Sequence, residues 1–335
     1  LFTDAPSAYK PADIHHLPED RLAVLSNDNG ATGSESRGYA ITTLNADSRP
    51  LWQVPPSGSD EYAEAFAVDG RGRLNVVVVR WGDSGAEFFL DRYEAATGAP
   101  LGRSRLLLPE GTWVWYAKPG IDGGIMLTGP RNDDGHVTFV DLDAQVRWSV
   151  TVPCEEDAVC NTGSLDYDAA RGVLVVGEVS RYNPDGLALR RSKVWTLSTS
   201  GTVQTGALLP LDETAMTDTA LIQWTEGGYV AGGEYGATVT DSASYGWVGR
   251  FDSNARPIWL ERFGSGKEYL DVRHGARTRE GGIVLVGYEG ATAGVAFRPF
   301  VRLQNGEGTL GWTRTAAQLS LRLATAFYHR VAVSN

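Results

Sequence analysis

The chain has 335 residues, of which 42% are hydrophobic and 21% are charged, a balance typical of a folded globular protein and not of a disordered or fibrous one. Its formal net charge is −11 and no basic cluster interrupts that acidity, so nucleic acid and anionic membrane surfaces are not expected partners. No apolar run approaches the roughly 18 residues of a transmembrane helix, and no transmembrane segment is expected.

Short apolar runs anchored by glycine recur through the whole chain. In chain order they cover residues 21–25, 72–77, 123–129, 172–177, 227–233 and 281–287. The last five have anchor glycines at positions 72, 124, 172, 228 and 282, which are 52, 48, 56 and 54 residues apart. A period of this length with several strands in each copy is typical of a β-propeller.

Each repeat reads as four strands in chain order. Strand a precedes the anchor, as in residues 113–116 and 220–224, and strand b is the apolar run itself. Strand c alternates in polarity, as in residues 136–141, 247–251 and 300–303, and a polar turn follows it. Strand d carries a tryptophan in four repeats, which we interpret as a packing residue between blades: Trp52, Trp148, Trp259 and Trp312.

These repeats predict an all-β fold, a single β-propeller domain of six four-stranded blades over residues 1–335, with seven blades as the alternative. The expected blades are residues 14–56 plus 324–334, 60–108, 112–153, 161–208, 216–263 and 267–315. The segment 326–333 reads as a strand with no partner after it, so we expect it to pair with the N-terminal strands and close the ring. Closure would remove the two exposed sheet edges of an open ring.

Residues 245–254, the following Trp259 and the run 281–287 show an alternating strand that ends in Asp, a polar turn, a Trp and later a paired glycine. This pattern resembles the tandem Asp-Gly-Gly propeller repeats of secreted bacterial proteins. Residues 95–98 and 141–148 also resemble repeats of quinoprotein-like propellers. The resemblance covers most of the chain and implies the fold, because such proteins include binding modules, assembly factors, surface proteins and some enzymes. No residues suit pyrroloquinoline quinone, so that cofactor is not expected.

Cys154 and Cys160 enclose five residues of a polar loop. This spacing favours a local disulfide in an oxidising compartment, with two free thiols or an incomplete metal pair as alternatives. The chain begins at Leu1 without a methionine. We therefore expect an exported protein, in the periplasm, at the cell surface or secreted.

No metal or cofactor site is expected, with calcium kept as an alternative. The acidic turns at residues 132–135 and 183–186 offer oxygen ligands, but neither has the complete spacing of a calcium loop, which favours solvated turns. The five histidines show no metal-ligand spacing on an expected strand. Only ring closure would bring His329 near His15 or His16, where zinc is the alternative.

The segments that enter strand a are repeatedly acidic, and in propellers this strand lines the central channel. Counting back from the anchors places Glu61, Trp113, Thr217 and Asp271 at one level, and Ala63, Trp115, Thr219 and Arg273 two residues later. Packing alone does not explain such different side chains at equivalent places. The candidate ligand-binding residues are Glu61, Glu64, Trp113, Trp115, Asp271, Arg273 and His274.

A rim of carboxylates, indoles and a guanidinium suits a sugar, a peptide or a cation. Since no nucleophile motif, metal cluster or nucleotide loop accompanies it, we expect a monomeric, non-enzymatic binding or scaffold protein that recognises a protein or glycan through one rim. The alternative is a carbohydrate-active hydrolase or lyase that uses rim carboxylates such as Glu61 and Asp271. A third hypothesis is a structural module of a larger surface assembly.

Overall fold

The protein is described from a computed structural model, which covers residues 9–17, 19, 21–28, 38–45, 47, 49–54, 61–82, 85–182, 188–211, 216–236, 244–264, 269–278, 281–290 and 298–315. Strands dominate these ranges, and the one helix among them is the short 3-10 turn Ile121–Gly123. The described residues contain no helix that would span a bilayer.

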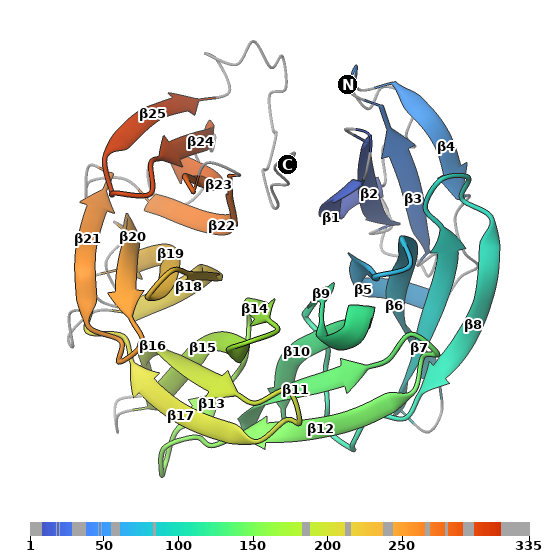
Figure 1. Ribbon diagram of the computed structural model, residues 1–335, viewed down its shortest axis with the longest axis horizontal. Helices are drawn as coiled ribbons and strands as arrows, with labels where there is room; N and C mark the ends of the chain where they lie inside the picture. Colours follow the sequence, from blue (N-terminus) through green and yellow to red (C-terminus); the bar gives the residue numbers. More distant parts are fainter. Residues whose placement is uncertain are drawn as a thin grey trace. The chain divides into compact units, whose positions relative to one another are not determined.

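The strands form six antiparallel sheets that follow one another along the chain (Figure 1). The first sheet contains β1 (Tyr9–Leu17), β2 (Arg21–Asp28), β3 (Tyr39–Leu44) and β4 (Pro50–Val54). The second contains β5 (Glu61–Val68), β6 (Arg73–Gly82), β7 (Gly85–Glu94) and β8 (Pro100–Leu106), and the third β9 (Tyr116–Pro119), β10 (Ile125–Arg131), β11 (Asp134–Val140) and β12 (Val146–Val152).

The fourth sheet contains β13 (Val159–Cys160), β14 (Leu165–Asp168), β15 (Gly172–Tyr182), β16 (Ala188–Leu197) and β17 (Val203–Leu208). The fifth contains β18 (Met216–Thr225), β19 (Gly228–Gly236), β20 (Ser244–Asp252) and β21 (Pro257–Phe263). The sixth contains β22 (Tyr269–Arg277), β23 (Ile283–Gly290), β24 (Arg298–Gln304) and β25 (Leu310–Thr315).

Each sheet is a meander in which successive strands pair, which is the construction of a propeller blade. The prediction of an all-β propeller with six four-stranded blades is confirmed. In the fourth sheet the first strand is divided, because β13 and β14 both pair with β15. In the third sheet the first strand starts at Tyr116, so the expected strand at residues 113–116 is wrong for all but its last residue.

The first sheet has four strands of its own because β1 occupies the place of strand a, against β2. The sequence had shown only a short apolar segment there. The C-terminal segment 324–334 lies outside the described residues, so its pairing with the first sheet stays a prediction.

The contacts divide the chain into two compact units. One unit contains Leu1–Thr128 with Val137–Ser149, and the other contains Gly129–His136 with Val150–Val333. In each unit the core lies between neighbouring sheets, and strand b supplies its centre, since Val76, Val78, Leu174 and Val176 are fully buried. Burial on both faces explains why these strands are continuously apolar and not alternating.

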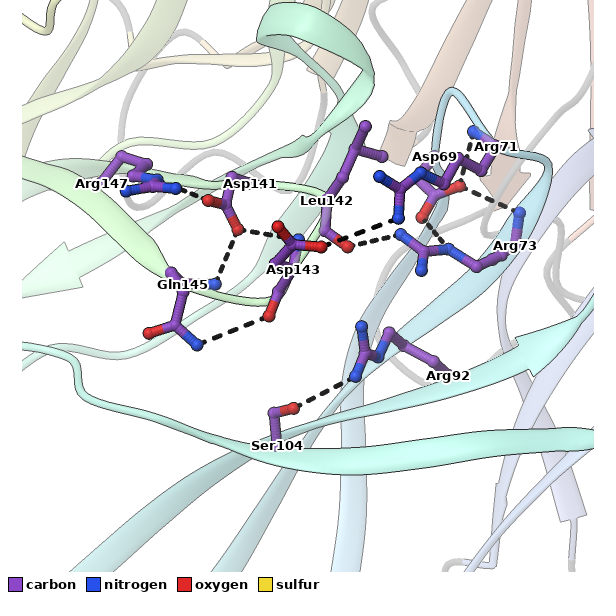
Figure 2. Close-up of polar contacts among 10 residues, drawn as sticks. All are labelled: Asp69, Arg71, Arg73, Arg92, Ser104, Asp141, Leu142, Asp143, Gln145 and Arg147. Atoms are coloured by element: carbon purple, nitrogen blue, oxygen red, sulfur yellow. Dashed lines mark hydrogen bonds and ion pairs between the residues drawn. The ribbon is translucent and has the colours of Figure 1, made fainter.

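The polar turns after strand c have one construction. The side-chain oxygens of Asp141, Asp252 and Asn305 each accept two backbone N–H bonds at 2.7–3.1 Å from the residues two and four positions later. Figure 2 shows the Asp141 turn against the turn that starts at Asp69, where the Arg73 guanidinium donates to the Leu142 carbonyl at 2.6 Å. The Asp–turn pattern of the sequence therefore closes strand c onto strand d and also holds neighbouring sheets together.

Two of the strand d tryptophans, Trp52 and Trp259, pack between neighbouring sheets as the sequence predicts, whereas the ring contact of Trp148 is with Phe139 of its own sheet. A Cβ on Gly98 would lie 2.5 Å from the indole of Trp52, and one on Gly308 would lie 2.8 Å from the indole of Trp259. Each indole therefore covers the turn of the following sheet. Both glycines also have positive φ, +74° and +88°, so their turns need glycine for two reasons.

Candidate functional site

A β-bulge interrupts strand a at a similar level in four described sheets. The register with strand b shifts around residue 12 in β1, Glu64 in β5, Ala220 in β18 and Arg273 in β22. A bulge leaves one residue unpaired and re-aims its side chain, and bulges are frequent beside functional sites. The bulge therefore singles out Glu64 and Arg273, both of which the sequence analysis had named.

Strand b approaches strand a unusually closely at three equivalent glycines. A Cβ on Gly177, Gly233 or Gly287 would lie 1.8–1.9 Å from the carbonyl oxygen of Asn161, Asp218 or Asp271, respectively. Each glycine ends its apolar run, and the residue that follows it is Glu178, Glu234 or Tyr288. This repeated approach places a polar pair, one residue from each strand, at the same level of the fourth, fifth and sixth sheets.

In the second unit these pairs gather into one polar group, because β18 packs against both β15 and β22 (Figure 1). We name it the carboxylate cluster, and its members are Glu178, Asp218, Glu234, Asp271, Arg273 and Tyr288. Glu178 shares a side-chain hydrogen bond with Asp218, and Glu234 shares one with Asp271. Four carboxyl groups from three sheets therefore meet in pairs.

The surroundings fix the geometry of the cluster. The Arg273 guanidinium lies 2.5 Å from the Asp271 carboxylate and donates to the Tyr288 hydroxyl at 2.5 Å. The buried Trp247 indole N–H donates to the carbonyl of Asp218 at 3.2 Å and to that of Glu234 at 3.0 Å. The fifth sheet thereby holds its two carboxyl groups in one place without neutralising either of them.

Burial and mutual repulsion make the cluster hold protons. Desolvation first, and then the charge of Asp218, raise the pKa of Glu178 to about 8. Desolvation and the charges of Asp271 and Asp218 raise the pKa of Glu234 to about 9. The pKa of Asp271 is raised by burial, against the opposing charge of Arg273. Glu178 and Glu234 are thus protonated at neutral pH, although ordinary glutamates are not.

The cluster is open to solvent on one side. Asp271 and Tyr288 are buried and the two glutamates are half-buried, but Asp218 and Arg273 are exposed. A ligand that approaches Asp218 therefore meets negative charge and exchangeable protons together. Chemically, the arrangement suits a ligand that brings a positive charge, which would replace the protons that now separate the carboxylates.

The sequence-derived candidate Glu61 lies in the first unit and is fully engaged. Its two oxygens accept from the Arg103 guanidinium at 2.6 and 2.8 Å, and the same guanidinium contacts both oxygens of Asp91 at 2.5 and 2.6 Å. Tyr39 hydrogen-bonds Asp91 from the first sheet. Glu61 therefore belongs to a network that ties strand a to the outer strands of its own sheet.

Glu64 and Trp113, two further candidates, contact each other in the first unit. A side-chain hydrogen bond joins them, and burial raises the pKa of Glu64 to about 7 in spite of that bond. The Trp113 ring packs on Trp81 with 5.3 Å between centroids, and Phe88 meets it edge-on at 5.6 Å. Trp81 is 51% exposed. This second polar–aromatic site is named the Trp81–Glu64 site.

Two further candidates, Trp115 and His274, are not members of the carboxylate cluster or of the Trp81–Glu64 site. Trp115 is at the border of exposure and its backbone N–H donates to Thr128, whereas His274 is buried in β22. Asp271 and Arg273, both named as candidates, lie in the carboxylate cluster, where an ion pair joins them. Asp218 and Asp271 share a level, not Thr217 and Asp271. Asp218 pairs with Glu234 and Asp271 with Tyr288, and both partners lie six residues after their anchor glycines at positions 228 and 282. The anchor count is corrected by that one residue.

Sequence reasoning missed Glu178 and Glu234. A signal existed in the residue after the closing glycine of each apolar run, where packing alone would favour another apolar side chain. That position holds glutamate in two repeats and Tyr288 in a third. The cross-sheet meeting of these residues needs three-dimensional packing, which no local pattern contains.

Cys154 and Cys160 form a disulfide, with 5.7 Å between their Cα atoms. This bears out the predicted bridge. The next residues continue into the site, since the Asn161 side chain and backbone bond Glu178. Among the described residues, no group of three or more His, Cys, Asp or Glu side chains is arranged to hold a metal ion. The acidic turn at 183–186 and the segment with His329 lie outside the described residues.

No protein-family model matches the chain, and no curated protein matches it significantly. Solved structures do share its fold. A prolyl endopeptidase matches with a TM-score of 0.53 and 12% identity, over 92% of this chain and 42% of that one. A mutant apocarotenoid oxygenase from Synechocystis matches with a TM-score of 0.51 and 10% identity, over 91% of this chain and 71% of that one.

A protein of unknown function from Bacteroides caccae is also similar, with a TM-score of 0.47 and 13% identity over 86% of this chain and 93% of that one. At such identities the likeness concerns the fold alone. The more specific resemblance to secreted Asp-Gly-Gly and quinoprotein-like repeats stays a prediction.

Proposed function

We propose that this propeller is an exported binding protein that recognises a protein partner by inserting a lysine or arginine side chain of that partner into the carboxylate cluster. The observation that carries this proposal is the meeting of four carboxyl groups from three sheets, with the Arg273 guanidinium bonded to Asp271 and the charge of a second arginine, Arg190, acting on Glu178. Packing does not require such a group, because burying carboxyl groups against each other opposes folding. A cationic ligand would supply the missing charge.

Three further features support this proposal, two of them the binding role and the third the export. The acidic net charge of −11 attracts basic partners and repels acidic ones. The cluster sits on strands and not on loops, and Trp247 fixes its backbone, which favours a preformed site. The disulfide between Cys154 and Cys160 supports export to an oxidising compartment.

The test compares two variants that each lose one charge at neutral pH. Asp218→Asn/Glu234→Gln changes two carboxyl groups of the cluster but removes only one charge, because Glu234 is already protonated, and Glu226→Gln removes one exposed carboxylate from a turn of the fifth sheet. Equilibrium binding of a decalysine peptide, measured by biolayer interferometry, is expected to fall about tenfold or more only in the cluster variant. Equal losses in both variants would mean that net charge alone attracts the peptide, and the proposal would fail.

The alternative function is a carbohydrate-active hydrolase or lyase. Glu64 favours it, since a carboxyl group with a pKa of about 7 suits a general acid near neutral pH. Other geometry supports binding instead: Glu61 is held by Arg103, and the paired carboxyls of the cluster are in hydrogen-bond contact, closer than the roughly 5–9 Å between the two carboxyls of glycosidases. Turnover of any member of a nitrophenyl glycoside panel, lost in Glu64→Gln or Asp271→Asn, would replace the binding proposal.

A further inference from the structure

The Trp81–Glu64 site presents an aromatic surface that the packing of the second sheet does not require. Trp81 lies at the end of the β6–β7 hairpin, paired with Ala86, and half of its side chain is in solvent. Trp113 comes from the connection between β8 and β9 and packs on Trp81 with an interplanar angle of 33°. Phe88, edge-on to Trp113, supports it from within the sheet. Trp113 is half-buried and packs against the core, so the exposed indole of this surface is that of Trp81, and an exposed indole supported in this way is typical of ligand contact.

A polar group stands beside this surface. The bulge in β5 leaves Glu64 without a place in the ladder, and its side chain bonds Trp113. Because that bond engages the polar edge of the Trp113 indole, a ligand meets ring faces and the Glu64 carboxyl. Glu64 is half-buried and carries a proton part of the time near neutral pH, since burial raises its pKa to about 7. It therefore both donates and accepts hydrogen bonds.

We propose that Trp81, Trp113 and Glu64 form a subsite for a neutral saccharide, in which a sugar ring lies on the exposed indole of Trp81 and a sugar hydroxyl bonds Glu64. Two observations favour a sugar over a cation. The two indoles are tilted by 33° against each other and form one surface, whereas cation recognition uses separate rings that surround the ligand. In addition, a partly protonated carboxyl matches a hydroxyl, which donates and accepts, better than it matches a cation. This inference goes beyond the protein-binding function, because residues of other sheets carry it.

The experiment titrates the whole protein with neutral oligosaccharides of glucose, xylose, mannose and N-acetylglucosamine, and follows tryptophan fluorescence and calorimetric heat. At least one series is expected to bind. Trp81→Ala is expected to lower its affinity about tenfold or more, and Trp81→Phe less, because a smaller ring remains. Glu64→Ala is expected to weaken binding, whereas Glu64→Gln keeps a donor and an acceptor and is expected to retain it.

The matched control is Ile258→Ala, which removes an apolar side chain of similar exposure, 55%, from β21. It is expected to leave saccharide affinity unchanged, as is the decalysine binding of Trp81→Ala. Three results would overturn the inference: no saccharide binds, the affinity of Trp81→Ala equals that of the natural chain, or choline and tetramethylammonium bind while saccharides do not. None of them depends on whether decalysine binds the carboxylate cluster.

Discussion

Glu178 and Glu234 hold protons because each has a carboxylate for a neighbour and little water around it. His136 shows the opposite behaviour. It is fully buried in β11, its Nδ1 contacts the Gly129 carbonyl at 3.0 Å, and desolvation lowers its pKa to about 4. Both kinds of group are neutral at pH 7, and each becomes charged in the unfolded chain at a pH where it stays neutral in the folded one. The glutamates therefore lower the stability of the fold as pH rises, and the histidine lowers it as pH falls.

Glu234→Gln is expected to stabilise the folded chain at alkaline pH. The folded pKa of about 9 lies above the ordinary value of 4.5, so the folded state binds more protons between these values and loses stability as pH rises through that window. The amide keeps the site neutral at any pH. At about pH 8 the unfolding free energy should rise by at least about 1.4 kcal/mol, the equivalent of one pKa unit, in urea denaturation.

The control for this variant is Glu226→Gln on the exposed turn before β19. Its dependence of stability on pH should match that of the natural chain. Glu178 still makes the Glu234→Gln protein lose some stability from pH 5 to 9. The contrary result is therefore a loss over this range as large as that of the natural chain; it would show that Glu234 is ionised in the fold, and the basis of the cation site would be lost.

His136→Gln is expected to remove part of the acid sensitivity. The folded pKa of about 4 lies below the ordinary 6.5, so the unfolded chain binds more protons in this window, and stability is lost as pH falls through it. The full effect in the natural chain is about 3 kcal/mol. Urea denaturation at a series of pH values should show a flatter acid side in His136→Gln and an unchanged acid side in Glu226→Gln, although the histidine variant is less stable throughout.

At the scale of residues, sequence predicted some members of each site and not their partners. Four site residues could be identified from the sequence because they lie on strand a or on the segment that enters it, at positions where blade packing does not need such side chains: Asp271, Arg273, Glu64 and Trp113. Glu234 could not be identified in this way, because it follows an apolar run whose sequence is typical of a buried core strand. Which candidates meet is decided by packing between sheets, and so Glu61 is found with Arg103 instead of in either site.

At the scale of elements, glycine spacing predicted the strands well, since the anchors and closing glycines have steric causes. Gly228 would place a Cβ 2.0 Å from the Phe251 carbonyl, and Gly233 one 1.9 Å from that of Asp218. A missing side chain where backbones touch is visible in sequence. The bulges were not visible, because they depend on the register between strands a and b. A register error of one residue therefore displaced the expected rim level in the sixth sheet.

Gly233→Ala is expected to destabilise the fifth sheet and to disturb the carboxylate cluster. The added methyl overlaps the Asp218 carbonyl, so strands β18 and β19 must separate at the level of the site. Overpacking of this kind reduces stability by about 1–3 kcal/mol. Thermal unfolding should show the loss, and decalysine affinity should fall with it, because Asp218 moves away from Glu234.

Gly236→Ala is the matched control. It lies three residues along the same strand, and a Cβ there would meet nothing within 4 Å. Its unfolding temperature and decalysine affinity should stay close to those of the natural chain. If both glycine variants were equally stable, the close approach of the two strands would not be a constraint on the sequence.

At the scale of the whole molecule, the repeat specifies the architecture and leaves the chemistry free. The six sheets are all antiparallel meanders and several of them repeat the same turns, indoles and glycines, while the side chains at the bulge and after the closing glycine change from sheet to sheet. This division explains why the fold was predictable from sequence and the sites only in part. It also means that two sites of different chemistry, one acidic and one aromatic, are compatible with a single construction.

The acidic net charge should act on the rate of association, and the carboxylate cluster on the rate of dissociation. Raising the ionic strength from about 0.01 M to about 1 M shortens the screening length from about 30 Å to about 3 Å, so the association rate of decalysine should fall steeply for a chain of net charge −11. The Asp218→Asn/Glu234→Gln and Glu226→Gln variants each lose one charge at neutral pH, because Glu234 is already protonated, and should associate similarly. Only the first should dissociate about tenfold faster or more, because contacts made within a site act on dissociation. Stopped-flow fluorescence measures both rates, and equal dissociation rates would place the peptide elsewhere on the acidic surface.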